Sequence, residues 1–373
     1  MTAFSTPTPD AGDGLDAALA LVAASSGERD RAPVPRFPTE AIAALEHAGA
    51  LAFNADAGRT RPPAAAELEL VRRVARADGS VGRIFDGHLN AIERLAVQAP
   101  PELRERELEA VRAGRLRAGV WGGDPRPGEG PPAGIARSAG GEVLRGVKTF
   151  CSGAGGLDRA LVLARDPAGG PPPAVWVDLR DGDRVEVDES WYRGYGLRAS
   201  VSHRVVFHDA RILARFGAPG ALTEQPWFSR DALRTASTWA GMADSAAEAA
   251  GAELSRRPAR GALEGLAAGQ IETSRRAISL WIDAGARAMD GGRDLPGVAL
   301  HARAGIAREC RALLDEASRA CGSWPFATAQ TLDRCRRDLE VFLLQHRLEP
   351  MLERAGTAVL DSLDAEDQVE DRP

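Results

Sequence analysis

The organisation of the chain follows from one segment, Val143-Leu-Arg-Gly-Val-Lys-Thr-Phe-Cys-Ser-Gly-Ala-Gly-Gly156. It comes after a tight-turn signal at 139–141 that separates two extended runs, 134–138 and 142–144, and so predicts a β-hairpin. Strand alternation then assigns the side chains to two faces, one with Val147, Thr149 and Cys151 and the other with Lys148, Phe150 and Ser152. A glycine-rich exit at 153–156 lets other groups approach the backbone. The segment fits the floor of a site for a flat cofactor, and equally an ordinary hairpin followed by a mobile loop.

The sequence on either side has a different hydrophobic period. Before residue 115 apolar residues recur at helical spacing, and Asp78-Gly79-Ser80 caps one long helix on which Phe85 and His88 share an apolar face. From 116 to 220 short alternating runs are separated by Gly and Pro turns, which is typical of an antiparallel β unit. After 220 the pattern predicts four long helices, the last from Leu332 to about Leu360, and so an antiparallel bundle.

We therefore expect an α+β fold with an N-terminal helical domain, a central antiparallel β-barrel and a C-terminal four-helix bundle. The expected boundaries are a disordered N-terminus at 1–13, a helical domain at 14–115, the barrel at 116–220, the bundle at 221–363 and an acidic, fraying tail at 364–373.

Composition and charge argue against several classes of protein. The 373 residues are 44% hydrophobic, which is globular, and no apolar run approaches the length of a membrane span. A formal net charge of −6 without basic clusters argues against nucleic acid and anionic membranes as partners. No signal segment opens the chain. The four cysteines lack any zinc-binding spacing, so we expect no metal site, and free thiols in the cytoplasm.

Several motifs occur in an order that resembles the acyl-CoA dehydrogenase superfamily of flavoproteins, from about Phe37 to Gly356. Near the opening segment, 144–148 is similar to the family's L-N-G-x-K turn, and 149–152 to its strand with an aromatic residue, a spacer and Ser or Thr. In the β region, residues 196–200 resemble the family's G-x-R-x-S and residues 205–212 its V-x-F-x-D-x-x-V strand. In the later helices, residues 257–261 together with Gln270 resemble R-x-x-F-G…Q, and residues 322–338 resemble G-G-x-G-F…R-D.

The resemblance implies FAD, or FMN in some branches, bound between barrel and bundle of a homotetramer or homodimer. Phe150 would stack at the flavin ring, and Ser152 would hydrogen-bond near its reactive nitrogen. Arg257 and Gly322 would face the pyrophosphate and adenine half of a dinucleotide, supplied in part by a neighbouring subunit. The complete set of candidate cofactor-binding residues is Trp121, Phe150, Cys151, Ser152, Arg257, Gln270, Gly322 and Arg337.

An acyl-CoA dehydrogenase needs a carboxylate base for the α-proton, and this chain lacks the family's Y-E-G-T segment that carries it. Counting nine residues from Arg337 leads to His346, which is either a base or donor beside the flavin or a core histidine. Some branches place the carboxylate on an earlier helix, near Asp231, which is otherwise explained as a helix N-cap. A second departure is Trp121, which takes the position of the flavin-contacting Thr of T-E-P-x-x-G-S-D. It would either cover the flavin or fill the mouth of the barrel.

Another branch of the superfamily contains flavin-dependent monooxygenases that are similar to dibenzothiophene desulfurisation enzymes. Their strand reads close to K-x-F-C-S-G-A, which matches Lys148 to Ala154, although their R-N-x-R-T-H segment is absent. They carry one histidine on an early helix, where His88 stands, and another near His346. His88 is alternatively a packed core residue.

The sequence thus predicts a flavin-dependent oxidoreductase acting on a small molecule. The first interpretation is α,β-dehydrogenation of an acyl thioester, which the resemblance would make an acyl-CoA, with electrons passed to an electron-transfer flavoprotein. The second is a monooxygenase that uses reduced FMN from a flavin reductase. The third is a catalytically silent paralogue that serves in assembly.

Overall fold

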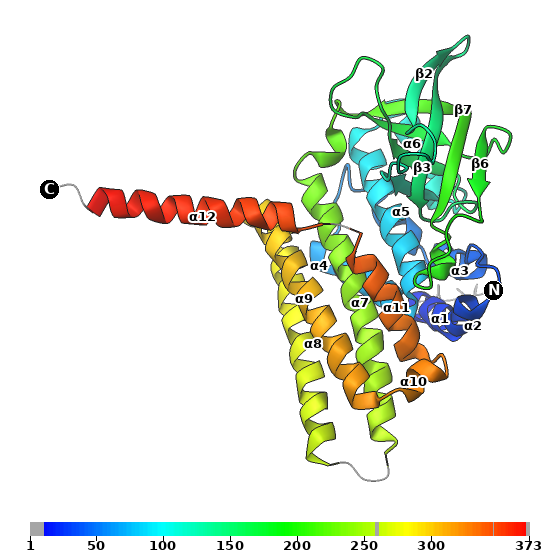
Figure 1. Cartoon of the computed structure of the whole chain (residues 1–373). Helices are drawn as coiled ribbons and strands as arrows, with labels where there is room; N and C mark the ends of the chain where they lie inside the picture. The colour runs from blue at the N-terminus through cyan, green and yellow to red at the C-terminus, as the bar shows by residue number, and fades with distance from the viewer. Residues whose placement is uncertain (1–10, 258–260, 346, 371–373) are drawn as a thin grey trace, which may run out of the picture.

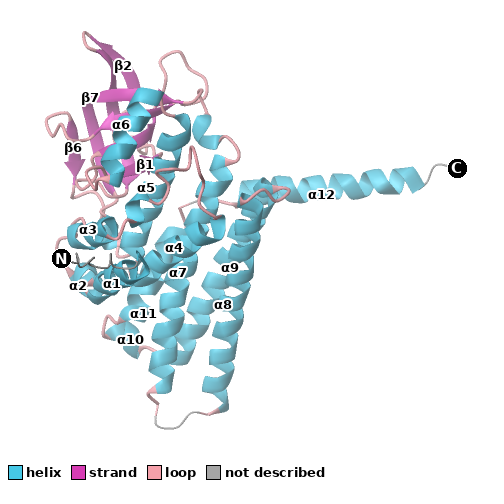
Figure 2. Cartoon of the chain, turned by 180° about the vertical axis from the view of Figure 1, so that it is seen from behind, coloured by secondary structure: helices cyan, strands magenta, loops and turns pink. Residues whose placement is uncertain are grey.

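The computed structural model describes residues 11–257, 261–345 and 347–370. Within these ranges, side chains are described for residues 14 to 363. The chain is a mixed α+β fold in which helices come first, a curled sheet follows and helices complete the molecule (Figures 1 and 2). The helical, β and helical order predicted from the sequence is therefore confirmed.

The first part of the chain is helical throughout. Its elements are α1 (Ala11–Ala24), α2 (Ser26–Arg31), α3 (Thr39–His47), η1 (Ala50–Ala52), α4 (Ala64–Ala77), α5 (Gly79–Gln98) and α6 (Pro101–Arg112). Asp78 caps α5 as predicted, because its side chain accepts a hydrogen bond from Val81 N at 3.1 Å. Buried residues occur on every side of α5, which places this helix in the centre of the molecule, between the sheet and the later helices.

The middle of the chain forms one seven-stranded sheet. Its strands are β1 (Ala118–Trp121), β2 (Gly134–Ser138), β3 (Gly141–Cys151), β4 (Arg159–Leu163), β5 (Ala174–Asp178), β6 (Val185–Asp188) and β7 (His203–Phe216), with a short η2 turn (Arg198–Ser200) before β7. They follow the order β1-β4-β5-β7-β3-β2, with β6 also paired to β7. The predicted hairpin is confirmed as β2 and β3. The expectation of purely antiparallel pairing is wrong at one place, since β1 pairs with β4 in parallel.

The last part of the chain returns to helices, connected to the sheet through η3 (Ala221–Thr223). These are α7 (Trp227–Ser255), α8 (Ala262–Met289), α9 (Leu295–Cys321), α10 (Trp324–Ala327), α11 (Thr331–Leu343) and α12 (Glu349–Glu370). Helices α7, α8, α9 and α11 share one large apolar core. The predicted single helix from Leu332 to Leu360 is wrong, because α11 ends before Pro350 and α12 starts in a new direction and projects from the body (Figure 1).

In the part of the chain that the structure describes, none of the helices has the length and apolar character needed to cross a bilayer. The same residues contain no group of three His, Cys, Asp or Glu side chains arranged as metal ligands. Cys151, Cys310, Cys321 and Cys335 are all free and buried.

Candidate functional site

The aromatic side chain of the opening segment points outward at the end of β3. Phe150 adopts a left-handed backbone conformation with φ of 54°, and the pairing of β3 with β7 shifts register between Lys148 and Cys151. The alternation predicted for this strand is therefore broken. Lys148 is buried and bonded to Asp124 at 2.7 Å, whereas the Phe150 side chain is 59% exposed. Its ring is packed against Trp191 in a T-shaped arrangement, with centroids 5.0 Å apart and an interplanar angle of 84°, and most of the side chain remains open to solvent.

Ser152 lies two residues further on and ends a chain of three hydroxyls. Ser200 Oγ donates to Leu197 O at 2.7 Å, which uses its single hydrogen. Ser202 Oγ must then donate to Ser200 Oγ, and Ser152 Oγ must donate to Ser202 Oγ, each at 2.8 Å. Ser152 therefore gives its hydrogen to the protein, and its oxygen retains a lone pair that can accept from a ligand.

Trp121 and Cys151 face the interior of the sheet rather than the open ring of Phe150. The Trp121 indole is buried beside Phe207 and donates from Nε1 to Ser152 O at 3.0 Å. Cys151 is buried in the same apolar cluster, and burial raises the pKa of its thiol. Trp121 therefore fills the interior of the sheet and supports the backbone of Ser152.

A histidine that was not among the candidates from the sequence also lies near this segment. His203 pairs in register with Cys151, is buried, and its Nδ1 has no hydrogen-bond partner among the described residues. Burial lowers its pKa, so the ring is neutral at pH 7. The available sequence signal was its position on the inward face of a strand with Val205 and Phe207, where a polar residue is unusual.

His88 is a fully bonded core residue. Its Nδ1 accepts from Ala118 N at 3.1 Å, so Nε2 carries the hydrogen and donates to Leu51 O at 2.9 Å. Burial lowers its pKa to about 4, which keeps the ring neutral. Both nitrogens are used by backbone groups, and the histidine joins α5 to β1. These contacts support the core interpretation rather than the catalytic one.

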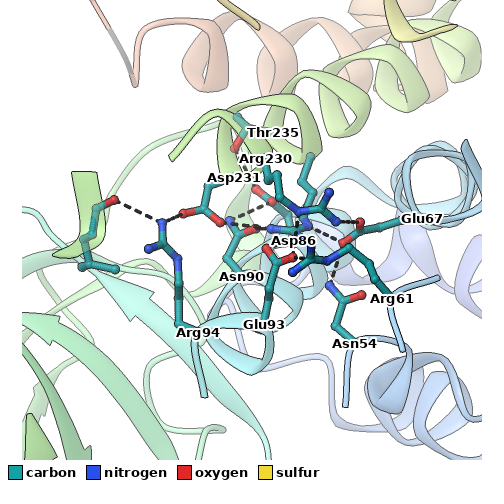
Figure 3. Close-up of polar contacts among 12 residues, drawn as sticks. Asn54, Arg61, Glu67, Asp86, Asn90, Glu93, Arg94, Arg230, Asp231 and Thr235 are labelled. Carbon is teal, nitrogen blue, oxygen red and sulfur yellow. Dashed lines mark hydrogen bonds and ion pairs between the residues drawn. The ribbon is translucent and has the colours of Figure 1, made fainter. Parts of the chain in front are cut away.

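Asp231 lies near the start of α7 and is held by two arginines. Its carboxylate accepts from Arg94 Nη2 at 2.6 Å and from Arg234 Nη1 at 3.0 Å (Figure 3). Burial raises its pKa to about 6 even though both guanidiniums act in the opposite direction. Arg94 also donates to Ala221 O and Leu222 O, so Asp231 belongs to a contact that fixes the connection between sheet and α7.

A buried ion-pair network lies beside Asp231, and the sequence did not indicate it. Arg230 donates to Glu67 and Glu93 at 2.7 Å each, and Arg234 donates to the same two carboxylates at 2.5 Å each (Figure 3). All four side chains are at most 1% exposed. The two guanidiniums lower the pKa of Glu93 although burial acts to raise it. The network ties α4 and α5 to α7.

The remaining cofactor candidates lie on the later helices, in separate places. Arg257 bonds Glu264 at 2.7 Å and Ala320 O, which brings it close to Gly322 at the end of α9. Gln270 is exposed on α8. Arg337 on α11 bonds Asp30 at 2.7 Å and Asp333 at 2.9 Å, and so joins α11 to α2. Six of these candidates thus fall into two groups. Trp121, Cys151 and Ser152 lie near Phe150 in the first group, and Arg257 lies near Gly322 in the second.

His346 lies outside the described residues. The neighbouring acidic residue of the R-D pair, Asp338, is buried and accepts from Leu197 N at 2.5 Å, and burial raises its pKa to about 7. Because Leu197 also accepts from Ser200, Asp338 positions the loop that starts the hydroxyl chain to Ser152.

Taken together, the end of β3 suits a flat aromatic ligand with a hydrogen-bond donor on its edge. Phe150 offers a free ring, Ser152 offers an acceptor, and a side chain at Gly155 would meet no other atom within 4 Å. A curled sheet between two helical parts, with such a surface at one strand end, agrees with the fold that the motifs led us to expect.

Comparisons with known proteins support this fold. No family model matches the chain. A dibenzothiophene monooxygenase of Mycolicibacterium goodii is 28% identical over 166 residues, which span 42% of this chain and 39% of that protein.

Three solved structures have the same fold over almost the whole chain. FMN-bound TdsC of Paenibacillus sp. A11-2 is 21% identical with a TM-score of 0.74 and covers 94% of this chain and 97% of its own. Methanesulfinate monooxygenase MsuC of Pseudomonas fluorescens is 19% identical with a TM-score of 0.81, at 96% and 98%. A probable acyl-CoA dehydrogenase of Mycobacterium abscessus is 18% identical with a TM-score of 0.78, at 94% and 99%. The resemblance to the acyl-CoA dehydrogenase superfamily and its monooxygenase branch is thus confirmed in the fold.

Proposed function

We propose that this protein is a flavin-dependent monooxygenase that takes reduced FMN from a partner reductase. The observation that carries the proposal is the exposed ring of Phe150 close in sequence to the acceptor oxygen of Ser152. Both residues belong to a segment whose sequence resembles that of the monooxygenases. When bound, a reduced flavin supplies two electrons, with which one atom of dioxygen enters the substrate and the other leaves as water. Reduced flavin carries a hydrogen on N5, which suits the acceptor that the hydroxyl chain leaves on Ser152.

FMN fits the remaining residues better than FAD. Arg257, carried over for the pyrophosphate and adenine half, and Arg337 of the R-D segment are both paired with carboxylates of this chain. FMN, which lacks the adenine half, does not need these two arginines, whereas FAD would compete with their internal ion pairs. FAD is the alternative if a neighbouring subunit supplies its own groups there.

The second candidate function is dehydrogenation of an acyl thioester. It is favoured by Asp231, because a carboxylate with a pKa of about 6 is suited to act as a general base near neutral pH. Two observations argue against dehydrogenation. Arg94 and Arg234 hold the Asp231 carboxylate, and Trp121 is buried in the position of the usual threonine. A silent assembly paralogue is the third candidate, and flavin binding distinguishes it from the other two.

The proposed partners and setting follow from the reaction. A monooxygenase of this kind needs a flavin reductase, whereas a dehydrogenase would need an electron-transfer flavoprotein, and either acts on a small molecule. We further propose a homodimer or homotetramer, a cytoplasmic location consistent with four free thiols, and domain boundaries near residues 115 and 220. In this architecture the curled sheet takes the place of the barrel, and α7, α8, α9 and α11 take that of the four-helix bundle.

Flavin reoxidation and flavin bleaching separate the two reactions. With protein-bound reduced FMN, rapid mixing with oxygenated buffer should give a reoxidation rate that differs from that of free reduced FMN. With protein-bound oxidised flavin and no oxygen, octanoyl-CoA should leave the absorbance near 450 nm unchanged. Bleaching by the thioester would instead establish the dehydrogenase, and identical reoxidation with and without protein would contradict the monooxygenase.

A further inference from the structure

A cavity of about 300 Å³ lies at the start of α12, away from the end of β3. It is formed where the N-terminal turns of α7 and α9 meet α12. Its apolar wall includes Phe228, Leu300, Leu348 and Met351. The volume is at the lower end of the range for sites that bind small organic molecules.

The charged groups of this cavity have one sign. Arg303 and Arg354 line it, and its lining contains no Asp or Glu among the residues that the structure describes. Arg354 is an exposed residue at the rim, whereas Arg303 is 3% exposed. The cavity therefore joins an apolar body to a buried cation.

Arg303 is not neutralised by the described part of the protein. Its Nε and Nη2 have no hydrogen-bond partner there, and it forms no ion pair within 4.0 Å. The guanidinium lies 5.3 Å from the ring centroid of Trp239, whose Nε1 also lacks a described partner. The one carboxylate that acts on it, Asp86, already accepts from Arg83, Asn90 and Thr235.

A buried cation without a counter-charge is costly, and such costs are usually met by a partner charge. Arg303 lines the cavity, so a ligand bound there can supply the missing partner charge. An arginine fork matches the two coplanar oxygens of a carboxylate, and it can equally bind two of the three oxygens of a tetrahedral sulfonate.

We propose that this cavity binds a compact organic monoanion, with its carboxylate or sulfonate on Arg303 and its apolar body against Phe228, Leu300 and Met351. The site is built from α7, α9 and α12 and does not use the residues assigned to the flavin. It therefore goes beyond the proposed function and can be tested without flavin.

Isothermal titration calorimetry of the flavin-free full chain with hexanoate tests the proposal, with 1-hexanol as the neutral probe of the same shape. Hexanoate should bind at least about tenfold more tightly than hexanol, because only the anion pairs with Arg303. Arg303→Met should remove that preference while raising the melting temperature of the ligand-free protein, since an unpaired buried charge is replaced by an apolar side chain. Arg308→Met, at an exposed site on the same helix, should change neither.

Leu300→Trp provides a variant that keeps the buried arginine and reduces the space. It should weaken hexanoate and hexanol binding alike, which separates loss of volume from loss of charge. Equal affinity for the two probes, tight binding of hexanoate to Arg303→Met, or no binding of hexanoate at millimolar concentration would each overturn the proposal.

Discussion

Phe150 lies near the end of β3 and Ser152 just after it, and the two face different surroundings because the pairing of β3 with β7 is irregular there. The left-handed backbone at Phe150 turns its ring outward, while Ser152 turns inward to the hydroxyl chain. A non-glycine residue at positive φ is uncommon and is maintained only where the surrounding structure supports it. This local geometry is what makes an exposed aromatic ring available beside a buried acceptor.

Replacing Phe150 by alanine should separate flavin binding from stability. The side chain is 59% exposed, so Phe150→Ala should change the free energy of unfolding by less than about 0.5 kcal/mol. The dissociation constant for FMN should rise by about tenfold or more, because a stacking surface is lost. Leu280→Ala, which truncates another exposed apolar side chain on α8, should affect neither quantity. Unaltered FMN affinity in Phe150→Ala would remove Phe150 from the site.

His88 should make the protein sensitive to acid. Its pKa of about 4 in the folded state lies below the usual 6.5, so the unfolded chain binds a proton more readily. The contribution of neutral His88 to the free energy of unfolding is therefore complete above pH 6.5, and it is lost as the pH falls towards 4. Between pH 7.5 and 4.5 the wild type should lose about 2 to 3 kcal/mol more unfolding free energy than His88→Gln in urea titrations. An equal loss in both proteins would show that His88 is not the buried, neutral residue described.

At the scale of elements, the sequence predicted the types of segment well and their junctions poorly. The hairpin of β2 and β3 and the cap of α5 carry local signals, a Gly-Gly turn and an Asp before a helix. The break between α11 and α12 was missed because helical periodicity continues on both sides of it. The parallel pair of β1 and β4 was missed because pairing direction depends on contacts distant in sequence.

The close approach of α4 and α7 depends on one glycine. A Cβ at Gly241 would collide with the backbone of α4 at Arg72 O and lie 2.8 Å from Arg76 N. Gly251 lies on the same helix with nothing within 4 Å. We expect Gly241→Ala to destabilise the protein by about 3 kcal/mol. Gly251→Ala should stabilise it by up to about 1 kcal/mol through helix propensity. Similar unfolding free energies for both variants in guanidinium titrations would contradict this packing.

At the scale of the whole molecule, the buried network of Glu67, Glu93, Arg230 and Arg234 joins α4 and α5 to α7, the first long helix after the sheet (Figure 3). Sequence reasoning could not find it, because its members are separated by up to 167 positions and each is an ordinary charged residue on a helix. The candidate site shows the same limit. The strand motif indicated Phe150 and Ser152, but the hydroxyl chain and the free Nδ1 of His203 depend on long-range packing.

Removing one carboxylate from this network should be costly. Glu67→Gln leaves two buried guanidiniums with one fewer negative partner and should lower the free energy of unfolding by about 3 to 5 kcal/mol. Glu248→Gln removes the partner of Arg76 at an exposed pair and should cost at most about 1 kcal/mol. Urea unfolding at neutral pH measures both. A small effect of Glu67→Gln would mean that the network does not hold the two helical parts together.

We propose above all that the end of β3 binds a flavin, preferably in its reduced form. Anaerobic titration of the purified protein with photoreduced FMN and with oxidised FMN, followed by fluorescence, measures this binding. We expect saturable binding of both forms, tighter for reduced FMN because Ser152 presents an acceptor, and loss of that binding in Phe150→Ala. Absence of saturable binding of either form, with FAD equally inert, would contradict it.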